Sequence, residues 1–164
     1  MKALFIGGIK SGKSINAQDY ILKASTTKPI YLATTEFIDK GLNKRIVEHK
    51  KNRKDTFETI EESLNIYESI KNANAPVLVE CVSMWINNML HHGFSIKEMK
   101  KELLSVLELD VTVVFVLNDV GAGIIPQNEL ASDFIDISGI LSQLIAQHCD
   151  EVYHTIAGIS TRIK

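Results

Sequence analysis

Short apolar runs alternate along the chain with longer amphipathic stretches. The short runs are rich in Val, Ile and aromatic residues, and they occupy residues 2–7, 29–34, 76–81, 111–118 and 151–158. Runs of this kind, bounded by Gly, Pro, Asp or Asn, are typical of buried strands. Apolar positions recur with helical spacing in residues 15–24, 38–53, 61–72, 84–90, 96–107 and 130–147. The alternation predicts an α/β fold whose mostly parallel sheet is flanked by helices.

The C-terminal stretch departs from this alternation. Residues 158–164 follow the last expected strand after only a Gly-Ile step, which is too short for a crossover helix. We therefore expect a C-terminal antiparallel hairpin. The chain has no internal repeat, low-complexity tract or Pro-rich linker, and its 164 residues suit one hydrophobic core. A single domain over residues 1–164 follows.

Composition narrows the classes of partner and the compartment. The formal net charge is −2, so nothing in the total charge suggests nucleic acid or a membrane surface. MKALFIGG at residues 1–8 runs directly into a Gly-rich segment, so we expect no secretory signal, and no apolar stretch reaches ~20 residues. Cys81 and Cys149 lie far apart and match no metal-ligand spacing, so we expect buried free thiols. A cytoplasmic protein fits these observations.

The first chemical motif is GGIKSGKS at residues 7–14. It satisfies G-x-x-x-x-G-K-[ST] and stands between an expected strand and an expected helix, where a phosphate-binding loop requires it. In such a loop, backbone N–H groups surround a phosphate, Lys13 reaches the β and γ oxygens, and the Ser14 hydroxyl can ligate Mg²⁺. The motif predicts that the chain binds a nucleoside triphosphate.

Phosphoryl transfer also needs an acid that holds Mg²⁺, and two residues are candidates. Glu80 ends one expected strand, and Asp119 follows another. A carboxylate just past a buried strand points into the crevice where ligands of open α/β sheets bind. The alternative for each is an acid that merely caps the next helix. Glu80 is the better candidate because its strand is shorter and cleaner.

A basic segment, VEHKKNRKDTFETIE at residues 47–61, carries one histidine. On a helix, Arg45, His49 and Arg53 are related by i, i+4 steps and share a face. Neighbouring cations stabilise negative charge and lower the pKa of an imidazole, which keeps it neutral and nucleophilic. On these residues alone, a solvated basic helix with an incidental histidine is the simpler interpretation.

Several blocks of sequence together resemble one known family. They are GGIKSGKS, YLATTE, RIVEHKKNR followed by TIE, LVECVSMWINNML, and the long C-terminal stretch that begins NDVGAGIIP. They are similar, in order and spacing, to the bifunctional adenosylcobinamide kinase/adenosylcobinamide-phosphate guanylyltransferase family of cobalamin biosynthesis. The resemblance covers nearly the whole chain. It implies a P-loop NTPase fold with a RecA-like strand arrangement and a homo-oligomer, a trimer as in relatives.

The resemblance also implies a two-step reaction on adenosylcobinamide. A nucleoside triphosphate, ATP or GTP, first phosphorylates the aminopropanol hydroxyl. GMP is then transferred from GTP onto that phosphate through a GMP-histidine intermediate, and pyrophosphate leaves. The histidine of this chain that matches the family's nucleophile is His49. A neutral imidazole suits this chemistry, because covalent catalysis splits one difficult transfer into two easier ones.

The site residues implied by the resemblance fall in several segments. The nucleotide-binding positions are Gly7, Gly8, Ile9, Lys10, Ser11, Gly12, Lys13, Ser14, Ala33, Thr34, Thr35, Lys50, Lys51, Asn52, Arg53, Glu61 and Glu80. Ser14 and Glu80 are also the expected Mg²⁺ ligands. One of the two acids, Glu61 or Glu80, could accept hydrogen bonds from the guanine edge, and the sequence leaves both open.

The chain departs from the family pattern at several positions. Lys10 replaces the usual arginine of the phosphate loop, which keeps the charge but loses the bidentate fork. Glu129, Ser132 and Ile135 stand where relatives often carry arginines. These departures keep open a relative that performs only the kinase step. A separate alternative is a non-catalytic switch that binds nucleotide through the loop and a protein partner through the basic helix.

Overall fold

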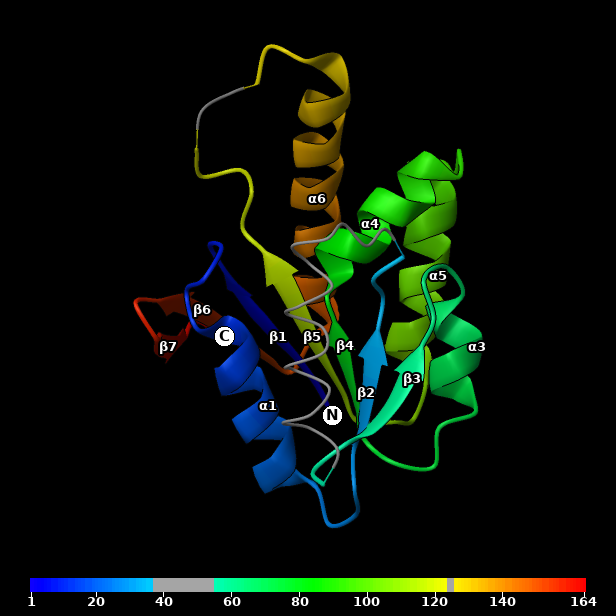
Figure 1. Cartoon of the computed structure of the whole chain (residues 1–164), viewed down its shortest axis with the longest axis vertical. Helices are drawn as coiled ribbons and strands as arrows, with labels where there is room; N and C mark the ends of the chain where they lie inside the picture. The colour runs from blue at the N-terminus through cyan, green and yellow to red at the C-terminus, as the bar shows by residue number, and fades with distance from the viewer. Residues whose placement is uncertain (37–54, 124–125) are drawn as a thin grey trace.

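The computed structural model describes residues 1–36, 55–123 and 126–164, in which strands and helices alternate (Figure 1). The helix expected over residues 38–53 lies outside these ranges. The described elements are, in chain order, β1 (Lys2–Gly7), α1 (Lys13–Ala24), β2 (Ile30–Ala33), β3 (Glu58–Glu61), α3 (Ile66–Lys71), β4 (Val77–Glu80), α4 (Val82–His91), α5 (Ile96–Glu108), β5 (Val113–Asn118), α6 (Glu129–His148), β6 (Glu151–Ile156) and β7 (Ile159–Arg162).

The strands of the described residues form a seven-stranded sheet in the order β3-β2-β4-β5-β1-β6-β7. Neighbouring strands pair in parallel except β6 and β7, which pair antiparallel. The mostly parallel sheet and the C-terminal hairpin are thus confirmed. Strand β5 lies between β1, which leads into the phosphate loop, and β4, which ends at Glu80. The carboxyl ends of β1 to β5 therefore meet at one edge of the sheet, the upper edge in Figure 1.

Successive residues of the strands face opposite sides of the sheet and enter two hydrophobic cores. On one face, Phe5 and Val114 pack with Ala17 and Ile21 of α1. On the other face, strand residues such as Phe115 belong to the larger core, which takes in side chains of α3, α4, α5 and α6. Among the described helices, α1 packs on one face of the sheet, and α3, α4, α5 and α6 cover the opposite face (Figure 1).

Strand β3 is where the sequence-based expectation was wrong. A helix was expected from residue 61 to residue 72, but Glu58–Glu61 pairs in parallel with β2, and the helix begins only at Ile66. In β3 only Ile60 is even half-buried, so this edge strand lacks the apolar run that marks the central strands. Pairing with β2 determines its conformation, and the Asn65 side chain then caps α3 by accepting from the Glu68 N–H.

The hairpin between β6 and β7 closes with a two-residue turn. Ala157 and Gly158 both have positive φ, 51° and 84°, as both central residues of a type I′ turn require. Ile156 and Ile159 pair on either side of it. Among the described residues, no helix is long and apolar enough to cross a membrane.

Candidate functional site

The carboxyl edge of the sheet gathers most of the predicted site residues. Gly7, Ala33, Glu61 and Glu80 are the last residues of β1, β2, β3 and β4. Ala33 pairs with Glu61 on one side and with Glu80 on the other, so these three residues form one row across the sheet. With strands ~4.8 Å apart, the Cα atoms of the two acids lie about 10 Å from each other. Residues predicted from distant segments are therefore brought to one edge.

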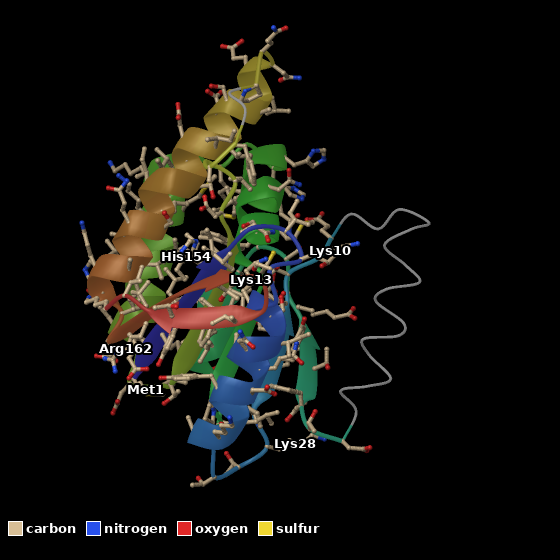
Figure 2. The ribbon with its side chains drawn as sticks, turned by 90° about the vertical axis from the view of Figure 1, so that its left-hand side faces the viewer. Met1, Lys10, Lys13, Lys28, His154 and Arg162 are labelled. Carbon is tan, nitrogen blue, oxygen red and sulfur yellow. The ribbon has the colours of Figure 1, made fainter. Side chains whose placement is uncertain are left out.

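The phosphate loop turns tightly between β1 and α1. Lys10 and Gly12 have positive φ, 58° and 95°, and Gly12 is the N-cap of α1. Gly8 has open space where a side chain would stand. The Lys13 ammonium donates to the Gly8 carbonyl at 3.1 Å, which directs the lysine back over the loop. Figure 2 shows Lys13 at the top of α1, with the exposed Lys10 farther out on the loop.

Burial determines the electrostatics of Lys13. The residue is only 6% exposed, and burial lowers its pKa, while the nearby Glu80 acts in the opposite direction. A bound phosphate would add negative charge beside the ammonium and offset the cost of desolvation. An anion bound at the loop would therefore stabilise the charged form of Lys13.

Ser14 and Glu80 form the part of the site suited to a metal ion. The Ser14 hydroxyl donates to Glu80 Oε1 at 2.6 Å, so the first turn of α1 meets the end of β4. Of the two candidate acids, Glu80 is thus the one that contacts the loop serine. Asp119 instead donates its backbone N–H to the Gly7 carbonyl at 2.9 Å.

The chemistry of these donors fits Mg²⁺. A hydroxyl and a carboxylate supply the hard oxygen atoms that Mg²⁺ prefers. Within the part of the chain that the structure describes, no group of three or more His, Cys, Asp or Glu residues could hold a metal by itself. A serine hydroxyl and one carboxylate suit Mg²⁺ bound with a nucleotide, where phosphates and water supply most ligands and the protein adds one or two.

A buried polar network supports the edge next to the loop. Thr34, fully buried, donates its hydroxyl to the Cys81 carbonyl at 2.9 Å and its N–H to the Glu80 carbonyl at 3.1 Å. The amide of Asn88 in α4 donates to the carbonyls of Thr34, at 2.6 Å, and Ser63, at 3.1 Å. The ends of β2 and β4 are thereby fixed to α4. Sequence reasoning missed Asn88, whose only signal is an amide within an apolar helix.

Cys81 and Cys149 both carry thiol groups with raised pKa values. Burial, with the charge of Glu80 beside it, raises the pKa of Cys81 to about 12, and burial raises that of Cys149 to about 12. Both are free cysteines, as predicted; Cys149 is buried, whereas Cys81 is only partly buried. A thiol that stays protonated at neutral pH is a poor nucleophile. Neither cysteine competes with the histidine chemistry predicted from the sequence.

A further acid at this edge pairs with the residue that caps the C-terminus of α4. Glu36, three residues beyond the end of β2, lies with its Oε1 2.8 Å from His92 Nε2. The hydrogen bond from His92 lowers the pKa of the Glu36 carboxyl. Sequence reasoning did not single out Glu36. The histidine and its partner come from segments 56 residues apart, and no local pattern joins them.

The proposed nucleophile and the cations after it lie outside the described residues. These are His49, Lys50, Lys51, Asn52 and Arg53. Their roles stay predictions, as does the geometry that relates them to the phosphate loop. The described part of the site can hold a triphosphate and a metal ion along the carboxyl edge.

Comparison with known proteins connects this geometry to a family. A family model described as "Cobinamide kinase / cobinamide phosphate guanyltransferase" matches residues 3–163. The chain is 31% identical to the bifunctional adenosylcobalamin biosynthesis protein CobP of Pseudomonas aeruginosa over 170 residues, which span 100% of this chain and 98% of that protein. It is also 31% identical to the bifunctional adenosylcobalamin biosynthesis protein CobU of Escherichia coli, over 183 residues and 100% of both chains.

Solved structures share the fold at low sequence identity. A KaiC-like protein of Pyrococcus horikoshii aligns with a TM-score of 0.51 and 15% identity over 93% of this chain and 69% of its own. An ATPase from a bacterial type III secretion system aligns with a TM-score of 0.52 and 12% identity over 98% of this chain and 56% of its own. Together with the strand order, these matches show the P-loop NTPase fold of the RecA-like kind.

Proposed function

The chain belongs to the cobinamide kinase / cobinamide phosphate guanyltransferase family, and on that basis we propose that it performs two successive transfers on adenosylcobinamide. It phosphorylates the aminopropanol hydroxyl with a nucleoside triphosphate, and it then transfers GMP from GTP to that phosphate, giving adenosylcobinamide-GDP. The observation that carries the proposal is the contact of Ser14 with Glu80, beside Lys13, at the carboxyl edge of the sheet.

The phosphate loop has the same part in both steps. Its N–H groups and Lys13 hold the triphosphate oxygens, where negative charge builds up during transfer. Ser14 and Glu80 would hold Mg²⁺ together with the nucleotide. The ion, when bound, neutralises charge on the phosphates and on the departing group. In the kinase step the substrate hydroxyl attacks the γ-phosphorus, and the nucleoside diphosphate leaves.

The second step uses His49 as a nucleophile. A neutral imidazole nitrogen attacks the α-phosphorus of GTP, the bond to the β-phosphate oxygen breaks, and pyrophosphate leaves. The phosphate of the corrinoid then attacks the same phosphorus, and the phosphorus–nitrogen bond breaks, which frees the imidazole. The cations Lys50, Lys51 and Arg53 stabilise the negative charge of both transition states. These assignments rest on the match of His49 to the family's nucleophile.

The sequence leaves open whether Glu61 or Glu80 accepts from the guanine edge, and the positions of the two acids support Glu61. Glu80 already accepts from Ser14, so its place is on the metal side of the nucleotide. Glu61 stands two strands farther from the loop in the same row, about 10 Å away by strand spacing. That separation suits the span from phosphates to base. We therefore assign Glu61 to the guanine edge, where a carboxylate accepts from the N–H donors of the base.

The proposal is tested by incubating the protein with Mg²⁺ and GTP labelled at the α-phosphate. We expect a covalent label that is stable in alkali and labile in acid, as a phosphoramidate is, and that is absent from His49→Ala. Adding adenosylcobinamide phosphate should move the label from the protein to the corrinoid. An unlabelled wild-type protein would contradict the guanylyltransferase step.

A second measurement separates the two alternatives. If the unlabelled protein still phosphorylates adenosylcobinamide, it is a kinase that lacks the second activity, in keeping with the absence of arginines at positions 129, 132 and 135. If it binds GTP but catalyses neither step, it is a nucleotide-dependent switch. Label that persists in His49→Ala would place the nucleophile on another residue.

A further inference from the structure

The C-terminal hairpin lies directly against the phosphate loop. In Figure 2 the hairpin passes beside Lys13 and the top of α1. A Cβ on Gly12 would come within 2.8 Å of Gly158 Cα, and a Cβ on Gly7 would overlap the carbonyl oxygen of Thr155. The hairpin thus leaves no room for a side chain at Gly7 or Gly12, so both positions require glycine. At Gly8 a side chain would meet open space.

A backbone hydrogen bond from the hairpin turn orients one peptide of the loop. The Gly158 N–H donates to the Ser11 carbonyl at 2.7 Å. The peptide between Ser11 and Gly12 is planar and trans, so the carbonyl and the next N–H point in opposite directions. With the carbonyl held toward the hairpin, the Gly12 N–H is directed away from it. The turn thus sets the direction of an amide in the segment that would surround a phosphate.

Asn16 joins the same turn to the first part of helix α1. Its amide nitrogen donates to the Gly158 carbonyl at 3.0 Å and to the Ser160 hydroxyl at 2.7 Å. Ser160 in turn lies 2.7 Å from the hydroxyl of Thr155, which is fully buried on β6. Asn16 itself donates its backbone N–H to Gly12 O at 3.1 Å. One side chain therefore connects the N-terminus of α1 to the hairpin turn and to β7, and through Ser160 to β6.

We propose that the β6–β7 hairpin holds the phosphate loop in its binding conformation, with Asn16 as the positioning residue that couples them. This inference rests on the proposed function, because it takes the loop to bind a nucleoside triphosphate. Asn16 acts through the orientation of the loop and the first turn of α1, and it needs no contact with the nucleotide. The hairpin residues lie more than 140 positions from the loop in sequence.

The test measures nucleotide affinity and folding in the same variants. Titration calorimetry with Mg²⁺ and a GTP analogue carrying a methylene bridge between the α- and β-phosphorus atoms gives Kd without turnover. Asn16→Ala removes both side-chain hydrogen bonds, and we expect Kd to rise roughly tenfold. Ser160→Ala removes one of them, and we expect a rise of about threefold to fivefold. Asn74→Ala, in an exposed loop before β4, is the matched control and should keep the wild-type Kd.

The outcomes distinguish positioning from plain stabilisation. A purely structural role would lower the melting temperature of Asn16→Ala without nucleotide and leave its Kd unchanged, which overturns the inference. If Asn16→Ala does not fold, Ser160→Ala decides alone, and a wild-type Kd in that variant again overturns it. If the wild-type protein does not bind the analogue, the proposed function fails and this inference fails with it. Weak binding by both variants beside normal binding by Asn74→Ala supports the positioning role.

Discussion

Two glutamates at the same level of the sheet differ because of what surrounds them. Glu80 ends a central strand and accepts from the Ser14 hydroxyl, while Glu61 ends the edge strand β3 two strands away. On the proposed assignment, these two carboxylates would serve opposite ends of a bound nucleotide. The assignment of Glu80 to the metal ion thus rests on its contact with Ser14.

Glu80→Gln should therefore lower turnover. The amide keeps the size of the side chain but loses the charge that Mg²⁺ requires, and we expect kcat of the kinase step to fall on the order of 10- to 100-fold. Steady-state kinetics over a range of Mg²⁺ concentrations measure the loss. Raising Mg²⁺ should recover part of the rate.

The matched variant is Glu61→Gln. It should leave the Mg²⁺ dependence of kcat unchanged and should instead reduce the preference for GTP over ATP. The opposite pattern, with Mg²⁺ dependence shifted in Glu61→Gln and nucleotide preference shifted in Glu80→Gln, would contradict the assignment made here.

At the residue scale, the sequence predicted what a local motif encodes and missed what distant residues form. Lys13 and Ser14 could be identified because the spacing of the loop follows from phosphate geometry. Glu80 could be favoured over Asp119 because it ends a short and clean apolar strand. Asn16 and Asn88 gave no such signal, since their partners lie 142 and 54 positions away, respectively.

At the scale of elements, one carboxylate connects α1 with both strands of the hairpin. Glu151 on β6 accepts from the hydroxyls of Tyr20, at 2.6 Å, and Tyr153, at 2.8 Å, and it pairs with Arg162 of β7 at 3.0 Å. Phe5 stacks on Tyr153 beneath this cluster, with ring centroids 4.6 Å apart. The same elements that meet at the phosphate loop are thus also held together farther along the hairpin.

This cluster predicts a pH dependence of stability. The hydrogen bonds from Tyr20 and Tyr153, and then the charge of Arg162, lower the pKa of Glu151 below its ordinary value of 4.5. The stabilisation is therefore complete above pH 4.5 and is lost as the pH falls through the lower pKa of the folded state. Glu151→Gln should be less stable than wild type at pH 7, and this difference should shrink as the pH falls below 4.5.

Urea denaturation at a series of pH values measures this difference. Tyr20→Phe removes one of the hydrogen-bond donors to Glu151. Its difference in unfolding free energy from wild type should change with pH in the same direction as that of Glu151→Gln, but by less. A difference in unfolding free energy between wild type and Glu151→Gln that is the same at neutral and acid pH would show that the charge of Glu151 is not what stabilises the cluster.

Strands could be predicted from the sequence where both of their faces are buried, because such strands consist almost entirely of apolar residues. Strand β5 is buried along most of its length and reads as a continuous apolar run. Strand β3 is exposed at three of its four positions and exists because β2 offers it a partner. A local pattern records burial, and it carries little information about pairing at the edge of a sheet.

At the scale of the whole molecule, the nucleotide site draws on both ends of the chain. The phosphate loop follows the first strand, and the hairpin behind it is formed by the last two strands. Parallel pairing of β1 with both β5 and β6 places these distant segments side by side. The sequence predicted the sheet and the hairpin, but the contact between hairpin and loop depends on strand order, which the alternation of elements does not specify.

A ligand that contacts this edge should therefore stabilise the whole fold. For a ligand at 100 times its Kd, binding to the folded state alone adds about 2.7 kcal/mol to the unfolding free energy. In a chain of this size we expect the melting temperature to rise by roughly 5 to 10 °C with the methylene-bridged GTP analogue and Mg²⁺. Differential scanning calorimetry measures the shift. Removal of Mg²⁺ by a chelator should reduce it, because Ser14 and Glu80 then lose the ion that links them to the phosphates. If the melting temperature stays unchanged at concentrations where calorimetric titration shows saturation, the analogue binds the unfolded chain as tightly as the folded one. Binding would then not depend on the fold.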